Sequence, residues 1–227
     1  MNCYKIAVTV LAFCFLTGVC YADSYEDAGY AIGRQIAQNL AKDEAHVVTT
    51  SEYKNDSYNA GKIKKVFVMS VVPQGFEQFV ADGNAIARTN QMVVKIMQKK
   101  GFQAESMDDV ITKISQEQNI NLKKILQNDT SQGWKIIMDY VNSHYDAICG
   151  IKIMTYRMIP GQASNRAEAT LDITISDPKL DVTVYSYTRQ YIRANLLLAP
   201  NSPIDMVKKI SNIFVAHFSD KVKKDSK

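Results

Sequence analysis

The pattern of apolar and polar positions changes several times along the chain, and each change predicts an element. From Val66 onward the segment IKKVFVMSVV is apolar on both alternating faces, as expected for a central strand that is covered on both sides. Between Phe76 and Lys100 apolar residues recur at helical intervals, and Gly101 follows as a C-terminal stop. The pattern therefore predicts a central strand followed by a long amphipathic helix.

A second strand and two further helices are expected in the middle of the chain. The short segment GFQAES fits a strand, and Ser106 with Asp109 forms a capping signal before the periodic segment MDDVITKIS. Another helix is expected to follow Asp129 or Thr130, either of which is a suitable cap. The lone tryptophan of that helix, Trp134, is assigned to the core.

From Ala147 onward the hydrophobic period becomes two, which predicts strands. The segments AICGIKIMTYRM and EATLDITIS alternate in this way, and the second has one apolar and one polar face. The turn DPK leads into LDVTVYSYTRQYIR, so the last two strands should form an antiparallel hairpin. A closing helix is expected near Ser202 and Pro203. The fold prediction is α+β, a mixed sheet with a C-terminal antiparallel meander, helices packed on it and a closing C-terminal helix.

The N-terminus carries the three parts of a secretory signal. Lys5 provides a positive charge, residues 6–19 form an almost unbroken apolar run, and Ala22 is a small residue before the sequence turns polar. The run is shorter than the roughly twenty residues that a membrane-spanning helix needs. Cleavage after Ala22 is favoured and would discard Cys20. In the alternative, Cys20 is lipidated and tethers the mature chain to a membrane, although Val19 stands where a lipoprotein signal usually has a small residue.

These observations divide the chain into four segments. They are a signal peptide at residues 1–22, a leading helix and polar linker at 23–62, a single α+β domain at 63–221 and a basic tail at 222–227. Ile32, Ile36 and Leu40 are spaced four apart and predict the leading helix. The composition, with 46% apolar and 22% charged residues and a net charge of +4, is that of an ordinary globular domain. The short lysine clusters GKIKK and DKVKKDSK are interpreted as solvated surface.

The order of the elements resembles a small domain of bacterial envelope proteins. The segments KKVFVMSVV, KIMQKKGFQAES, YDAICGIKIMTYR and TLDITISDPKLDVTVYSYTR are similar to the amino-terminal domain of TolB, to curli-secretion lipoproteins and to penicillin-binding-protein activators. In those proteins one aspartate precedes a strand and another precedes the turn of a hairpin. Asp146 and Asp177 fill these places. The resemblance implies an accessory or assembly role in the envelope through protein contacts, and it carries over no active-site residue.

No motif in the sequence indicates catalysis, a metal or a cofactor. There is no G-x-S-x-G elbow, no histidine or cysteine cluster with zinc-ligand spacing and no glycine-rich phosphate loop. The best candidate for a catalytic set is His144 with Asp146 and Cys149, and the alternative function is therefore a hydrolase that uses His144 and its neighbours. However, alternation puts Asp146 and Cys149 on different faces of one extended segment. After signal cleavage Cys149 is the one cysteine left, and its apolar surroundings place it in the core. We expect no enzyme activity.

The last strand offers the best candidate for a binding surface. Alternation places Tyr185, Tyr187, Arg189, Tyr191 and Arg193 on one side, and tyrosine and arginine are the residue types that concentrate in binding hot spots. In the alternative, the tyrosines pack beneath a helix with their hydroxyls at its edge, and the arginines cover the rings. The modest charge, the export signal and the lack of an RNP signature exclude nucleic acid. We therefore expect an exported, periplasmic or envelope-associated accessory protein that contacts a protein or an envelope polymer.

Overall fold

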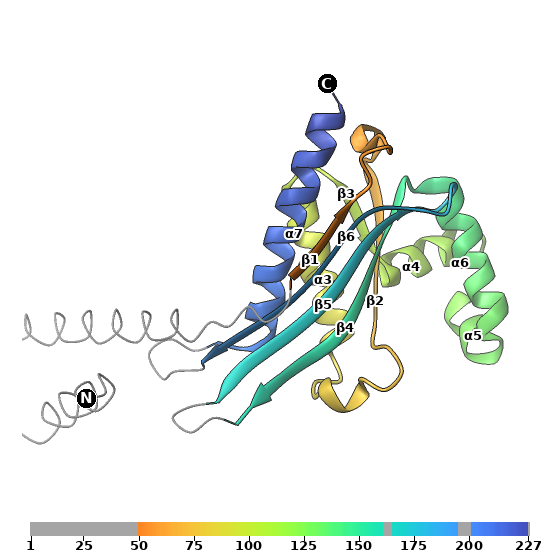
Figure 1. Cartoon of the computed structure of the whole chain (residues 1–227). Coiled ribbons are helices and arrows are strands. Elements are labelled where there is room, and N and C mark those ends of the chain that lie inside the picture. Colours follow the sequence, from red (N-terminus) through yellow and green to blue (C-terminus); the bar gives the residue numbers. More distant parts are fainter. Residues whose placement is uncertain (1–49, 161–164, 195–200, 227) are drawn as a thin grey trace, which may run out of the picture.

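A six-stranded mixed sheet forms the centre of the molecule (Figure 1). The computed structural model describes residues 50–160, 165–194 and 201–226. The strands are β1 (Thr50–Lys54), β2 (Lys65–Val71), β3 (Gln103–Ser106), β4 (Ala147–Ile159), β5 (Arg166–Asp177) and β6 (Val182–Ala194), in the spatial order β1-β6-β5-β4-β2-β3. β3, β2 and β4 run parallel, whereas β4, β5, β6 and β1 are antiparallel neighbours. The predicted α+β class and the predicted hairpin of the last two strands are confirmed.

Helices cover the two faces of the sheet unequally. The helical elements are η1 (Ala60–Lys62), η2 (Glu77–Phe79), α3 (Ala85–Lys99), α4 (Met107–Glu117), α5 (Leu122–Asn128), α6 (Thr130–His144) and α7 (Pro203–Asp225). α3 and α7 pack on one face over the larger core, while α4, α5 and α6 form a smaller core at one end of the other face (Figure 1). The described part of the chain therefore forms one sheet with two separate apolar cores.

β2 lies between the two cores, as the apolar run from Val66 predicts. Val66 and Val68 belong to the larger core, and Phe67, which points the opposite way, belongs to the smaller one. All three side chains are fully buried. A strand with helices on both faces needs apolar residues at consecutive positions, which explains the lack of alternation in the sequence.

Two predictions about the elements before α6 need correction, and one helix was not predicted. The polar stretch assigned to a linker contains β1, because Thr50–Lys54 pairs with β6 even though every residue of the strand is exposed. The long helix begins at Ala85 and not at Phe76, since Gly75 has a positive φ of 89° and η2 follows it. The sequence pattern does not predict α5, which supplies Leu122 to the smaller core.

The capping predictions for the other helices are confirmed. Ser106 and Asp109 form a reciprocal capping box at the start of α4, and Asp129 caps α6 by accepting a hydrogen bond from the backbone of Gln132. α7 begins at Pro203 with Ser202 as its N-cap. Satisfied N-terminal amides fix where each helix starts, which is why short local patterns are sufficient to place them.

The C-terminal segment assigned to a basic tail is the last turn of α7. Asp225 accepts a hydrogen bond from the backbone N–H of Ala60 at 3.0 Å and lies 3.0 Å from Nζ of the buried Lys221. A Cβ atom at Gly61 would lie only 2.8 Å from the backbone of Asp225, so this approach requires glycine. η1 and the last turn of α7 therefore belong to the same packed unit as the predicted domain of residues 63–221.

The predictions for the N-terminus lie outside the described residues. They are the signal peptide with its cleavage after Ala22, the lipidation of Cys20 and the leading helix around Ile32, Ile36 and Leu40. Among the residues that the structure describes, no helix is both long and apolar enough to cross a membrane.

Candidate partner-binding site

The five residues predicted to form a binding face do lie on one face of β6. Each is the register partner of a β5 residue in the larger core. The pairs are Tyr185 with Ile175, Tyr187 with Ile173, Arg189 with Leu171, Tyr191 with Ala169 and Arg193 with Ala167. Cross-strand partners share a face of the sheet, so all five side chains project toward the side on which α7 packs.

Tyr185 and Tyr187 are buried beneath α7 and offer no surface to a partner. Their exposed fractions are 0% and 1%. The ring centroid of Phe214 lies 5.5 Å from that of Tyr185 and 6.3 Å from that of Tyr187. The prediction of an exposed face is therefore wrong for these two residues, because alternation identifies a shared face but does not say what covers it.

The hydroxyl groups of both tyrosines are used within the protein. The Tyr185 hydroxyl donates to Glu52 of β1 at 2.6 Å, and Glu52 also lies 3.0 Å from Lys54 and 3.2 Å from His217 of α7. Burial and the bond to Glu52 raise the pKa of Tyr185. The Tyr187 hydroxyl accepts a hydrogen bond from Nη1 of Arg189 at 2.7 Å. These contacts hold β1, β6 and α7 together and serve a structural purpose.

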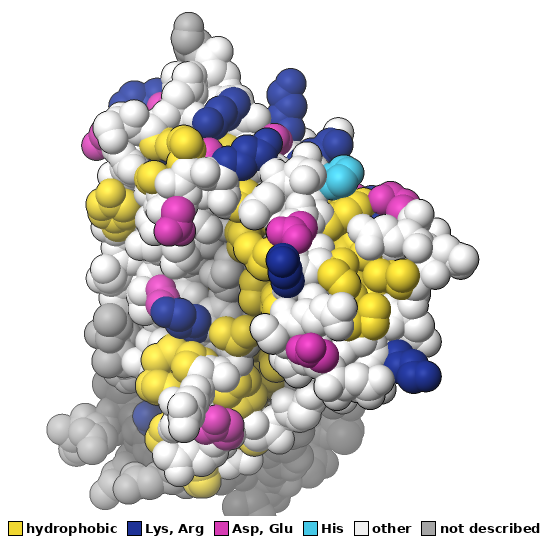
Figure 2. Space-filling view, turned by 90° about the vertical axis from the view of Figure 1, so that its right-hand side faces the viewer, with side chains coloured by type: hydrophobic (Ala, Val, Ile, Leu, Met, Phe, Trp, Pro, Cys, Tyr) yellow, Lys and Arg dark blue, Asp and Glu magenta, His cyan; other side chains and the backbone are white. Residues whose placement is uncertain are grey.

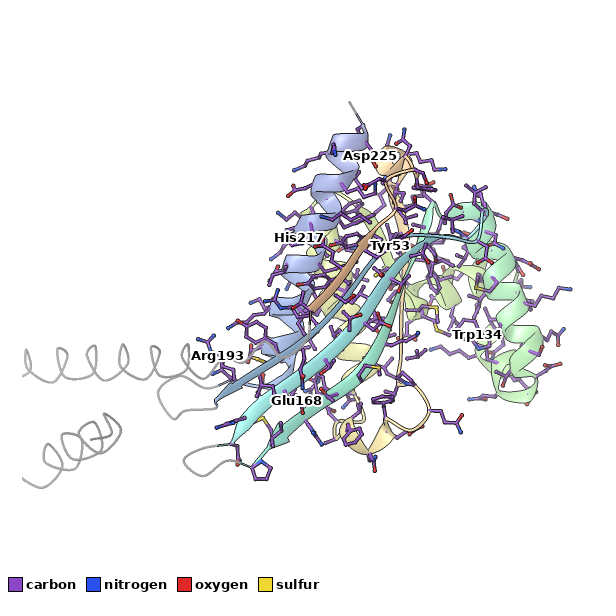
Figure 3. The ribbon with its side chains drawn as sticks, viewed as in Figure 1. Tyr53, Trp134, Glu168, Arg193, His217 and Asp225 are labelled. Atoms are coloured by element: carbon purple, nitrogen blue, oxygen red, sulfur yellow. The ribbon has the colours of Figure 1, made fainter. Side chains whose placement is uncertain are left out.

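The other three residues of the predicted face, Arg189, Tyr191 and Arg193, are partly exposed, and Lys209 of α7 lies beside them. The guanidinium of Arg189 lies 5.6 Å from the ring centroid of Tyr191, and Nζ of Lys209 lies 5.3 Å from the same centroid. Arg193 comes next along this face of β6, and Figure 3 shows it at the end of the sheet away from Trp134 of α6. We call Arg189, Tyr191, Arg193 and Lys209 the basic cluster.

The charge of Lys209 lies near one like charge and one opposite charge. Burial lowers the pKa of Lys209, and the like charge of Arg193 lowers it further, whereas Asp205 acts in the opposite direction. The Asp205 carboxylate caps α7 by accepting bonds from the backbone and side chain of Ser202. Within the described part of the chain, no carboxylate forms an ion pair with Arg189 or Lys209. Nε of Arg189 is buried and has no hydrogen-bond partner there either.

Sequence reasoning missed Lys209 because its contact is tertiary. Lys209 follows the core residues Met206 and Val207 and precedes Ile210, so helical periodicity marks it as a residue beside the apolar stripe. Nothing in the local sequence shows that this part of α7 lies over Tyr191. To predict the contact between Lys209 and Tyr191, one would have to know how α7 is positioned along β6.

The opposite face of β4, β5 and β6 is polar, but its groups are largely paired with one another. The pairs include Thr155 with Thr170, Arg157 with Glu168, Gln190 with Glu168, Thr188 with Asp172 and Lys152 with Asp172. The carboxylate of Glu168 is almost fully buried between its two partners. Because these donors and acceptors satisfy each other, this face has less to gain from a polar ligand than the basic cluster has.

The trio considered for hydrolysis is not assembled. The Cys149 thiol is completely buried in the larger core, and burial raises its pKa, which disfavours the nucleophilic thiolate. His144 stacks on Tyr140 and its Nδ1 lies 2.9 Å from the Tyr140 carbonyl. Asp146 accepts hydrogen bonds from the backbone N–H groups of Lys64 and Lys65, at 2.9 and 2.8 Å.

The rest of the surface offers weaker candidates. Figure 2, which looks at the side of the molecule on the right of Figure 1, shows apolar side chains in several patches divided by charged ones. A shallow open depression between α4 and α5 is lined by Ile111, Ser115 and Ile120, and Lys123 is the one charged residue in its lining. In the portion of the chain that the structure describes, no three histidine, cysteine or carboxylate side chains gather as metal ligands would.

Comparisons with known proteins identify the fold but no family. No family model and no curated protein matches the chain. Among solved structures, a PelC dodecamer from Paraburkholderia phytofirmans, in space group C2, aligns with a TM-score of 0.51 and 8% identity over 75% of this chain and 98% of that one. A PelC dodecamer from the same organism in space group P6 gives 0.50 and 9%, over 75% and 96%. Lipoprotein GNA1162 from Neisseria meningitidis gives 0.41 and 10%, over 71% and 99%.

Proposed function

We propose that this chain is an exported accessory protein of the bacterial envelope that acts by binding a partner and carries out no catalysis. The observation that carries the proposal is the basic cluster. Neither Arg189 nor Lys209 forms an ion pair with a carboxylate within the described chain, and Arg193 adds a like charge beside Lys209 that Asp205 offsets only in part. Like charges held together raise the free energy of the site, and a negatively charged partner would lower it.

Two further observations support this function. The signal at residues 1–22 predicts export, and a mature chain with a single buried cysteine does not depend on disulfides in an oxidising compartment. The fold is also found in PelC, whose structure is a dodecamer, so the same architecture serves elsewhere in a protein that assembles through contacts between chains.

The compartment is tested by the intact mass of the protein purified from its native cells. A chain that begins at Asp23 without modification would support a soluble exported protein. A chain that begins at an acylated Cys20 would support a membrane-tethered one. An uncut chain that begins at Met1 in the cytosolic fraction would overturn the proposal.

The binding site is tested by charge reversal in the cell. We expect Arg193→Glu combined with Lys209→Glu to abolish the co-purification of crosslinked envelope partners without lowering the unfolding temperature, because both side chains are partly exposed. The matched control is Lys123→Glu with Lys124→Glu on α5, which makes the same change in net charge on exposed residues far from the cluster. If the cluster variant keeps every partner that the control keeps, the binding site is elsewhere.

A further inference from the structure

We propose that β1 pairs with the same strand of a second copy of this chain, so that two sheets join into one across a two-fold axis at Tyr53. The inference goes beyond the proposed function, because it concerns contacts between identical chains and does not involve the basic cluster. Its basis is that β1 is an open edge strand whose side chains are complementary to those of an identical strand.

β1 forms one edge of the sheet, and its outer side has no strand beside it in the described chain (Figure 1). Every residue of Thr50–Lys54 is exposed, and apart from the ladder with β6 no hydrogen bond to a described residue engages the backbone of this strand. The opposite edge, β3, is less open, because Gln98 donates to the Ala104 carbonyl and Asp109 accepts from the Ser106 N–H. An unpaired edge offers its backbone donors and acceptors to a further strand.

Pairing about Tyr53 places opposite charges across the new interface. In an antiparallel pair centred on this residue, Tyr53 faces Tyr53 of the second copy, and Glu52 of each chain faces Lys54 of the other. The two-fold symmetry makes two such pairs of opposite charge. Edge lysines alone would repel a second copy, whereas glutamate and lysine two positions apart attract it in this one register.

The carboxylate of Glu52 can accept a cation from the second copy. Its hydrogen-bond and ion-pair partners within the described chain, which are Tyr185, Lys54 and His217, all contact Oε1. Oε2 is left for the Lys54 ammonium of the second copy. The exposed fractions of the two side chains are 30% for Glu52 and 44% for Lys54, so both can be reached at the edge of the sheet.

Both faces of the joined sheet have room for this arrangement. Tyr53 is the register partner of Ser186, so it projects from the face opposite α7, where it is 50% exposed (Figure 3). Two tyrosine rings that meet across the axis cover this surface. On the other face α7 packs over β5 and β6. With strands about 4.8 Å apart, the α7 helices of the two copies lie about 19 Å from each other, which exceeds the roughly 10 Å diameter of a helix.

A single introduced cysteine tests the position of the axis. The full chain is expressed in its native cells with Cys3, Cys14 and Cys20 changed to serine, so that only the fully buried Cys149 remains. On this background Tyr53→Cys should form a disulfide-linked dimer when it is oxidised with copper phenanthroline. Directly opposite residues have Cα atoms about 4.5–5.5 Å apart, which is within the reach of a disulfide.

Ser51→Cys is the matched control for the crosslink, because it lies on the same face of the same exposed strand. In the proposed register Ser51 faces Asn55 of the second copy, and the two Ser51 residues are about 14 Å apart along the strands, too far for a disulfide. We expect little crosslinking of this variant. Equal crosslinking of the two variants would overturn the register, and no crosslinking of Tyr53→Cys would overturn the pairing.

Analytical ultracentrifugation tests the charge pairs without any new cysteine. Lys54→Glu places a glutamate opposite Glu52 twice and should raise the dissociation constant of the dimer about 25-fold, since each of the two pairs contributes about a factor of five. Lys123→Glu on α5 makes the same change in net charge at an exposed position and should dimerise like the parent. A parent that sediments as a monomer at every concentration, or a dimer that Lys54→Glu leaves unchanged, would overturn the proposal.

Discussion

The hydroxyl oxygen of Tyr58 lies 2.6 Å from Oδ2 of Asp177, although 119 positions separate the two residues. Asp177 ends β5, and its Oδ1 accepts the backbone N–H groups of Lys179 and Leu180 in the turn to β6. One carboxylate therefore fixes both a local turn and the segment that leads from β1 to β2. Burial opposes ionisation of this carboxyl, but these hydrogen bonds outweigh it and hold the pKa of Asp177 below its ordinary value.

The lowered pKa of Asp177 predicts a loss of stability in acid. A carboxyl whose pKa is lowered by folding stabilises the protein fully above its ordinary pKa near 3.8, and this contribution is lost as the pH falls through the folded value. Asp177→Asn should cost about 1–3 kcal/mol of unfolding free energy at neutral pH. Urea unfolding at neutral pH and at about pH 2, well below the pKa of an ordinary aspartate, should show the variant and the parent converging in acid. A difference that stays constant with pH would contradict this account.

The aromatic cluster between α7 and β6 predicts a large cost for a single truncation. Phe214 is fully buried and its ring packs near those of Tyr185, Tyr187 and Phe218. Phe214→Ala should lower the unfolding free energy by about 3–5 kcal/mol, since it removes the ring and leaves a cavity. Denaturant titration measures the loss. The neighbouring Ile213→Ala, at a partly buried position, should lower the unfolding free energy clearly less. Similar losses for the two variants would contradict a large contribution from the aromatic cluster.

The burial of Cys149 predicts an unreactive thiol. Its side chain is fully enclosed in the larger core, and burial raises its pKa. In protein cleaved after Ala22, an aromatic disulfide reagent should not label the chain under native conditions and should label one thiol per chain in denaturant. Rapid labelling of the native protein would contradict the burial of Cys149 and indicate a reactive thiol.

The contact between Asp225 and Lys221 predicts that the last turn of α7 contributes to stability. Removing the carboxylate in Asp225→Ala leaves the buried Lys221 ammonium and the Ala60 N–H without this partner. We expect a loss of about 2–3 kcal/mol in thermal or urea unfolding. Asp220→Ala on the same helix is the control, because that side chain is exposed. If both variants lower the unfolding free energy by the same small amount, the last turn of α7 does not contribute to stability.

The sequence carried the local information about the fold but not the long-range contacts. Capping residues such as Ser106 and Asp129 act within one turn, so the starts of their helices could be predicted. β1 could not, because its residues are polar and exposed and only pairing with β6 makes it a strand. The same limit applies to the site. Alternation correctly placed Tyr185 and Arg193 on one face of β6. The burial of Tyr185 by α7 and the contact of Lys209 with Tyr191 depend on how that distant helix packs on the sheet.

The pairing of β1 with β6 also bears on the order in which the chain assembles. Its register partners are separated by 131 positions (Lys54 and Tyr185) to 139 positions (Thr50 and Arg189). In a chain made from its N-terminus, β1 emerges early and waits for a partner that emerges much later, and such long-range pairing is slow. During that interval β1 stays unpaired. Among the strands of the described sheet, β1 is therefore the one that stays longest without its partner.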